Sequence, residues 1–234
     1  MSHDRSQSIR LVCHGRFFFA LFSLFRYSIS IGLLERPLVI GLFWGAFSGD
    51  YTTSLYIAIF FELLWLDLIP VGTFIPPHLT AATFSALALT TYFGLEHPAR
   101  IMGVLFASMP LAWLGTRVEM MIRDQEQGSY NRLLNWARNP ESPNLPGTLI
   151  MKSMTRTFIM SGLSFFIAIL IIKQCMQLLF SVYPGFLTSI NITWAHLWIA
   201  ATLGGLMALR VKRAYAVLTT GISLFVLFLV WSRF

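Results

Sequence analysis

The stretch TSLYIAIFFELLWLDLIPVGTFIPPHLT, residues 53–80, decides how this chain folds. Its first part, residues 53–69, is almost continuously apolar, yet it contains two carboxylates, Glu62 and Asp67. The next eight positions carry three prolines and a glycine that end any regular helix: Pro70, Gly72, Pro76 and Pro77. At about 1.5 Å per residue the apolar part covers roughly 25 Å, slightly less than a membrane core of about 30 Å. The stretch therefore predicts a helix that enters a bilayer and breaks before it leaves.

A broken helix beside a carboxylate predicts a solute-binding site. Irregular backbone at membrane depth is tolerated only where protein or a water-filled cavity satisfies its N–H and C=O groups. A charged residue near the centre of a membrane helix costs about 2.5–3.5 kcal/mol on insertion scales, so we expect Glu62 to face a cavity or a protein partner. Transporters build their substrate sites from discontinuous helices of this kind.

The composition independently predicts an integral membrane protein. Of the 234 residues, 56% are hydrophobic and only 12% are charged, whereas an ordinary globular chain has about 25% charged residues. The net charge of +7 would suggest nucleic-acid binding in a soluble protein. Here the cations lie mostly between apolar segments, which is typical of membrane topology, and no nucleic-acid partner is expected. We predict one all-α polytopic membrane domain over residues 1–234, with about six to eight hydrophobic segments that include broken or re-entrant helices.

Three short motifs resemble one family of membrane proteins. Residues 62–78 read ELLWLDLIPVGTFIPPH, residues 35–41 read ERPLVIG, and residues 49–53 read GDYTT. At this spacing they resemble the membrane subunit IIC of the mannose/fructose/sorbose-family sugar phosphotransferase systems. Two positions depart from the family pattern: Asp67 stands where the family usually has Gly, and His78 where it usually has Asp or Asn. The resemblance in motif covers about residues 34–91, and the later segments resemble the family in order and length.

The resemblance implies a transport function. The chain would be a multi-pass channel subunit in a bacterial cytoplasmic (inner) membrane that binds a hexose or amino sugar and carries it inward. It would form an oligomer with a IID-like membrane subunit. Soluble IIA and IIB phosphocarrier components would phosphorylate the sugar, so this chain would not itself be an enzyme. No cofactor is implied.

The candidate sugar-binding residues lie in or beside the broken stretch: Glu62, Asp67, Gly72, Thr73, Pro76, Pro77, His78 and Asp50. Sugars are neutral and rich in hydroxyls, so their sites use carboxylates, amides and freed backbone groups. Glu62 is the first candidate acceptor, and His78 takes the place of an expected Asp or Asn ligand. In a continuous helix Asp67 would be rotated by about 140° from Glu62 and would therefore face another element.

Other interpretations of these residues remain open. Each candidate can instead form an interhelical hydrogen bond without contacting substrate. Asp50 in particular fits a helix cap in a solvated turn better than a sugar ligand. No metal site is expected, because the histidines and cysteines show no ligand spacing.

The remaining segments complete the predicted topology. We expect a first amphipathic or partly inserted helix over 17–34 and a short apolar run over 37–47 that forms a hairpin with the next segment. Small residues over 79–95 predict a helix buried against other helices. The following span, 99–114, contains Pro110 and is expected to kink.

The polar segment at about 117–156 is predicted to be a cytoplasmic loop because it holds many of the interior cations. Within it we expect a helix over 118–137 and an irregular loop over 139–147, acting either as a solvated linker or as a docking surface. Beyond it we expect three further apolar segments: a spanning helix over 157–172 closed by Lys173 and followed by an amphipathic stretch over 174–182, a helix over 194–209, and a final segment over 214–231.

Two other function classes fit the same sequence. One is a proton-coupled transporter in which Glu62 or Asp67 binds and releases the proton. The other is a membrane scaffold that keeps the fold without transporting anything.

Overall fold

All regular structure in the described part of the chain is α-helical. The computed structural model describes residues 35–66, 77–138, 144–183, 185 and 190–208, together with residues 216, 219, 220 and 223. Its helices are α2 (Pro37–Ser48), α3 (Tyr51–Leu64), α4 (Leu79–Phe93), α5 (Pro98–Arg138), α6 (Leu145–Val182) and α7 (Trp194–Ala208). The predicted helix over 17–34 lies outside the described residues, as does most of the segment over 214–231. The prediction of an all-α fold is confirmed.

Helices α2 and α3 form the predicted hairpin. Gly49 ends α2 in the left-handed conformation, with φ of 80°, and Asp50 then starts α3. The two helices lie very close, because a Cβ added at Gly41 would come within 2.5 Å of the Ala58 Cβ. Small residues at a helix contact allow this approach in a membrane. The close approach of α2 and α3 therefore requires the absence of a side chain at Gly41.

Helix α4 is buried on all sides along most of its length. Every residue from Leu79 to Thr90 is buried, and the helix contacts α2, α3, α5 and α6. Its polar side chains are compatible with burial partly because they bond to their own helix, as when the Thr83 hydroxyl donates to the Leu79 carbonyl at 2.9 Å. At the far end the indole Nε1 of Trp44 donates to Thr91 Oγ1 at 3.0 Å and joins α2 to α4. The prediction of a buried small-residue helix is confirmed.

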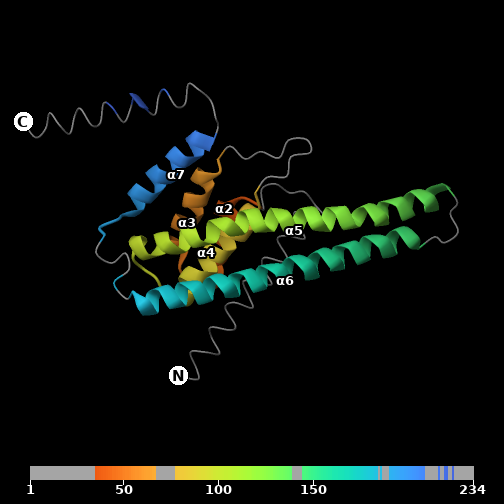
Figure 1. The fold of residues 1–234 in the computed structure, drawn as a ribbon, viewed down its shortest axis with the longest axis horizontal. Helices are drawn as coiled ribbons and strands as arrows, with labels where there is room; N and C mark the ends of the chain where they lie inside the picture. The colour runs from red at the N-terminus through yellow and green to blue at the C-terminus, as the bar shows by residue number, and fades with distance from the viewer. Residues whose placement is uncertain are drawn as a thin grey trace, which may run out of the picture.

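Helices α5 and α6 form a long antiparallel pair that extends beyond the other helices (Figure 1). They contain 41 and 38 residues, or about 60 Å each against a membrane core of about 30 Å. Two contacts fix their register: the Arg100 guanidinium lies 5.8 Å from the centroid of the Phe180 ring, and Arg156 donates a hydrogen bond to Gln125. The two helices therefore continue for roughly 15–20 Å beyond the hydrogen bond between Gln125 and Arg156.

Only these two of the described helices are long and apolar enough to cross a membrane by length and composition. The others have 12 to 15 residues and cover about 18–22 Å. Such short apolar helices reach across a bilayer only with help from neighbouring protein or local thinning of the lipid. The described fold thus consists of a short-helix cluster, made of α2, α3, α4 and α7, that packs against the long hairpin of α5 and α6.

Several predicted boundaries were wrong. Helix α3 ends at Leu64, not at residue 69, since Pro70 would clash with the carbonyl of Leu66 in a continuing helix. The predicted irregular loop over 139–147 is too long, because α6 already begins at Leu145 with Pro146 in its first turn, a position where proline is favourable.

Neither Lys173 nor Pro110 interrupts its helix. Helix α6 continues through Lys173 to Val182, and the long Lys173 side chain places Nζ 4.5 Å from the centroid of the Tyr92 ring. The charge can therefore leave the apolar zone while the backbone stays helical. Pro110 lies inside α5 without ending it, and α5 also contains the whole of the predicted helix over 118–137.

Candidate functional site

The candidate site lies where α3 ends and α4 begins, on either side of the predicted break. The structure describes the chain up to Leu66 and again from Pro77. It therefore places four of the candidate residues: Glu62, Pro77, His78 and Asp50. The other four lie outside the described residues: Asp67, Gly72, Thr73 and Pro76. Because α3 ends at Leu64, before Asp67, the rotation of about 140° expected for a continuous helix does not relate Asp67 to Glu62.

Glu62 faces the start of α2. Its Oε1 accepts a hydrogen bond from Nη1 of Arg36 at 3.3 Å, and its Oε2 accepts one from the backbone N–H of Leu38 at 3.4 Å. The N–H of Leu38 has no partner within α2, because it lies in the first turn of the helix. The Glu62 side chain is only 16% exposed and Arg36 is 41% exposed. Glu62 thus has the protein partner that a carboxylate in an apolar helix requires.

His78 is fixed against α5. It is 5% exposed, and its backbone N–H donates to the Ala112 carbonyl at 2.9 Å. A Cβ added at Gly115 would lie 2.7 Å from the His78 Cβ. The absence of a side chain at Gly115 therefore makes room for His78, directly after Pro77 at the end of the break.

Helix α7 closes a further side of the same region. A Cβ added at Gly205 would lie 2.6 Å from the Leu63 carbonyl oxygen, so α7 touches the last turn of α3 through backbone. At the other end of the contact Trp198 Nε1 donates to the Tyr56 carbonyl at 3.2 Å. The Tyr56 ring packs edge-on against Trp198 with centroids 5.1 Å apart. The described residues on the two sides of the predicted break therefore contact α2, α5 and α7.

The sequence interpretation missed a charged pair close to His78. Glu119 lies one helical turn beyond Gly115 on α5, is buried, and its Oε1 accepts from Nη2 of Arg123 at 2.6 Å. It was missed because residues 117–156 were interpreted as a cytoplasmic segment, either a solvated linker or a docking surface, that lies outside the candidate site. The spacing of Gly115, Glu119 and Arg123 places all three on one face of a helix, which indicates the ion pair but not its burial.

Asp50 lies at the opposite end of α3 from Glu62. The two are separated along the helix axis by about 18 Å, which is longer than a hexose, so one sugar molecule does not contact both at once. Oδ1 of Asp50 accepts from the Thr53 backbone N–H at 3.0 Å, which is the helix cap given above as one alternative for this residue. Asp50 also lines a cavity of about 180 Å³ with Thr53, Ser54, Thr90 and Glu96.

The region around the break has the chemistry of a polar-solute site. Glu62, His78 and Glu119 offer acceptors, and Arg36 and Arg123 offer donors, within a cluster of otherwise apolar helices. No group of three or more His, Cys, Asp or Glu residues suited to a metal ion occurs among the described residues.

A family comparison identifies the kind of protein. A family model described as "PTS system sorbose-specific iic component" matches residues 16–227. The chain belongs to this IIC family. IIC components are the sugar-specific membrane subunits of phosphotransferase systems, so the resemblance carried by the motifs over residues 34–91 extends over nearly the whole chain. No curated protein matches the chain significantly.

A structural comparison supports the fold. A solved structure described as "Structure of membrane protein" is similar with a TM-score of 0.63, at 16% sequence identity, covering 97% of this chain and 93% of that one. At this identity the likeness concerns the fold alone. The membrane fold of a IIC component is therefore supported by both comparisons.

Proposed function

We propose that this chain is the sugar-translocating IIC subunit of a mannose-family phosphotransferase system. It binds a hexose or amino sugar from outside the bacterial inner membrane and releases it to the cytoplasm for phosphorylation by IIA and IIB components. The observation that carries this proposal is the family match over residues 16–227. The phosphoryl group is transferred on the soluble partners, and this chain supplies the passage.

Glu62 is the proposed acceptor for sugar hydroxyls. Its carboxylate is held by Arg36 and by the Leu38 N–H at 3.3 and 3.4 Å, which are long for charge-assisted hydrogen bonds. A sugar hydroxyl that donates to the same carboxylate forms a shorter bond without requiring that the ion pair break. A carboxylate has two oxygens with about four acceptor positions, so it serves both partners.

His78 is the proposed second ligand. A neutral imidazole has one donor and one acceptor nitrogen and can therefore replace the Asp or Asn of the family pattern as a partner for hydroxyls. Its backbone is fixed by the bond to Ala112 and by the close contact at Gly115. Between Glu62 and His78 the chain would contribute Gly72 and Thr73 through backbone and hydroxyl groups. Asp67, Pro76 and Pro77 would shape this part of the site.

The proposed assembly includes a IID-like membrane subunit. Helices α2, α3, α4 and α7 are shorter than the membrane core, and large apolar side chains such as Leu42 and Phe43 on α2 are about half exposed. A second membrane subunit would cover such faces and lengthen the protein path across the bilayer.

Uptake into vesicles tests the proposal. The chain is co-expressed with a IID-like membrane subunit and with IIA and IIB components, and labelled sugars are supplied with either phosphoenolpyruvate or a pH gradient. We expect accumulation of sugar phosphate that requires phosphoenolpyruvate. Accumulation of free sugar driven by the pH gradient would instead support the proton-coupled alternative, and no uptake of any sugar with either driving force would support the scaffold alternative.

A further inference from the structure

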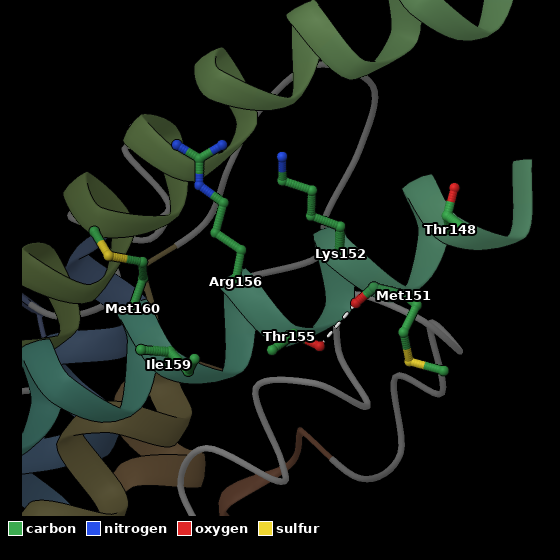
Figure 2. Close-up of a pocket in the computed structure, with 7 residues that line it drawn as sticks. All are labelled: Thr148, Met151, Lys152, Thr155, Arg156, Ile159 and Met160. Carbon is green, nitrogen blue, oxygen red and sulfur yellow. Dashed lines mark hydrogen bonds between the residues drawn. The ribbon is translucent and has the colours of Figure 1, made fainter. Parts of the chain in front are cut away.

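One face of α6 forms a surface groove at the point where the long hairpin leaves the short-helix cluster (Figure 2). The residues that line it lie between Thr148 and Met160 at spacings of three and four, so they share one side of the helix. The groove has a volume of about 820 Å³. Two of its residues are cations, Lys152 and Arg156, and its apolar members include Met151, Ile159 and Met160. The groove is therefore both positively charged and apolar.

The two cations have no counter-charge among the described residues. Figure 2 shows both side chains extending from α6 towards α5. The Arg156 side chain donates to Gln125, which is neutral. The Lys152 side chain forms no hydrogen bond or ion pair within the described part of the chain. The carboxylates at this level of α5, Asp124 and Glu126, form no ion pair with either cation. An anion at this position would therefore meet two unneutralised charges.

The position along α6 indicates the level of the lipid headgroups. No charged residue occurs between Arg156 and Lys173, a distance of about 25 Å along the helix, which is close to the thickness of the hydrocarbon core. Arg156 thus lies at one edge of the apolar zone, with Lys152 one turn further out. Ile159 and Met160 lie one turn deeper, at the level of the acyl chains.

We propose that this face of α6 binds the headgroup of an anionic phospholipid. Lys152 and Arg156 hold the phosphate, and the first part of an acyl chain lies against Ile159 and Met160. Basic side chains at the edge of a membrane helix attract anionic lipids, and long Lys and Arg side chains reach the headgroup level while their stems stay in apolar surroundings. The combination of charge and apolar lining fits a phospholipid better than it fits a free anion.

Lipid binding to the purified protein tests this proposal. The protein, with its membrane partner, is prepared in detergent with phosphatidylglycerol or phosphatidylcholine, and retained lipid is counted by native mass spectrometry. We expect the wild type to retain phosphatidylglycerol in preference to phosphatidylcholine and to be stabilised against heat by it. The double variant Lys152→Gln/Arg156→Gln should bind phosphatidylglycerol at least tenfold more weakly. The matched control, Arg132→Gln/Arg138→Gln, removes the same charge from the projecting part of α5 and should bind like the wild type.

A charge-preserving variant and competing ligands test the same site further. Lys152→Arg/Arg156→Lys preserves both charges and should retain the lipid, even if the neutral variant folds poorly. Equal loss in both charge-neutralised variants would overturn the proposal, since binding would then depend only on net charge. If inorganic phosphate stabilised the protein against heat as strongly as phosphatidylglycerol does, the groove would be assigned to a free anion. If a protein were retained in the groove in place of lipid, the groove would be assigned to a protein partner. Either result would overturn lipid binding.

Discussion

Arg36, which precedes α2, lies 3.3 Å from the carboxylate of Glu62 in the last turn of α3. The pair joins the start of the α2–α3 hairpin to the residues just before the break. The ion pair thereby stabilises a carboxylate in an apolar helix. The pair also fixes the direction of the Glu62 side chain, together with the N–H of Leu38.

Replacing Glu62 by Gln should weaken sugar binding about tenfold. The amide keeps the shape and one acceptor oxygen, but hydrogen bonds to a charged group contribute roughly 1.5–3 kcal/mol against about 1 kcal/mol for neutral ones. The difference corresponds to about one order of magnitude in affinity. Calorimetric titration of candidate sugars into the complex with its membrane partner measures it.

Asp50→Asn provides the matched control, because it makes the same carboxylate-to-amide change at the other end of α3. We expect little change in sugar affinity, since Asn also caps helices well. Equal affinity of Glu62→Gln and wild type would remove Glu62 from the site. A loss confined to Asp50→Asn would move the site to the cavity beside Asp50.

Gly115→Ala should destabilise the protein and weaken sugar binding together. The new Cβ would lie 2.7 Å from the His78 Cβ, which belongs to the stem of the side chain and moves only with its backbone. Such overpacking costs about 1–3 kcal/mol. Thermal unfolding in detergent and sugar titration would both report it.

Gly128→Ala is the control on the same helix. Nothing lies within 4 Å of a Cβ added there, so the variant should be stabilised by about 0.5–1 kcal/mol through helix propensity. If Gly115→Ala gained stability in the same way, the close contact between His78 and α5 would be wrong.

Gly205→Ala should loosen α7 from α3. Its Cβ would meet the Leu63 backbone carbonyl oxygen at 2.6 Å, whereas a Cβ at the neighbouring Gly204 would meet only the tip of the Leu64 side chain at 3.1 Å. We therefore expect Gly205→Ala to lower the unfolding free energy by about 1–3 kcal/mol, with Gly204→Ala close to neutral. Protease sensitivity of the α7 region, compared between the two variants, tests this order, and a reversed order would contradict the α3–α7 contact.

The projecting part of the α5–α6 hairpin is predicted to lie in the cytoplasm. It continues the segment richest in cations, as the positive-inside rule requires. After Cys13 and Cys175 are replaced by Ser, Ser129→Cys should react with an impermeant thiol reagent only in inverted vesicles. Glu96→Cys, just before the other end of α5, should react only from outside intact cells. Labelling of Ser129→Cys from outside intact cells would contradict the predicted topology and indicate the opposite orientation.

The chain should also require its membrane partner for stability. Four of the described helices are too short to span the membrane core, so we expect aggregation or rapid degradation when this chain is expressed alone, and recovery on co-expression with a IID-like membrane subunit. Fluorescence-detected size exclusion measures both conditions. Isolation of a monodisperse chain that binds sugar without a second subunit would contradict the prediction.

The sequence predicted the elements that depend on local composition. Small residues in α4 indicated burial, and the run starting at Pro37 with glycines at its end indicated a hairpin. The sequence did not predict that α6 begins at Leu145 or that this helix continues past Lys173. The helix can pass Lys173 because the long side chain of this residue places its charge beside Tyr92 while the backbone remains helical. Charge position alone therefore misplaced the helix ends.

The site was predicted less completely than the fold. Glu62 was expected to face a cavity or a partner, but Arg36 lies 26 residues away in sequence, and no local pattern links the two. Glu119 was missed because its segment was interpreted as a cytoplasmic linker or docking surface, outside the candidate site. Its burial depends on the way α5 packs, which no spacing within α5 reveals by itself.

The complete burial of α4 has a consequence for how the chain is made. Helix α4 has no lipid-facing side from Leu79 to Thr90 and is rich in Thr and Ser. Moving from the translocon into lipid as a single helix therefore gives α4 little favourable free energy. The α2–α3 hairpin is synthesised before it and α5 directly after it, so stable release of α4 into the bilayer must wait until α5 has emerged. Nascent chains halted between α4 and α5 should therefore stay at the translocon, and insertion of this protein should proceed by whole helical pairs.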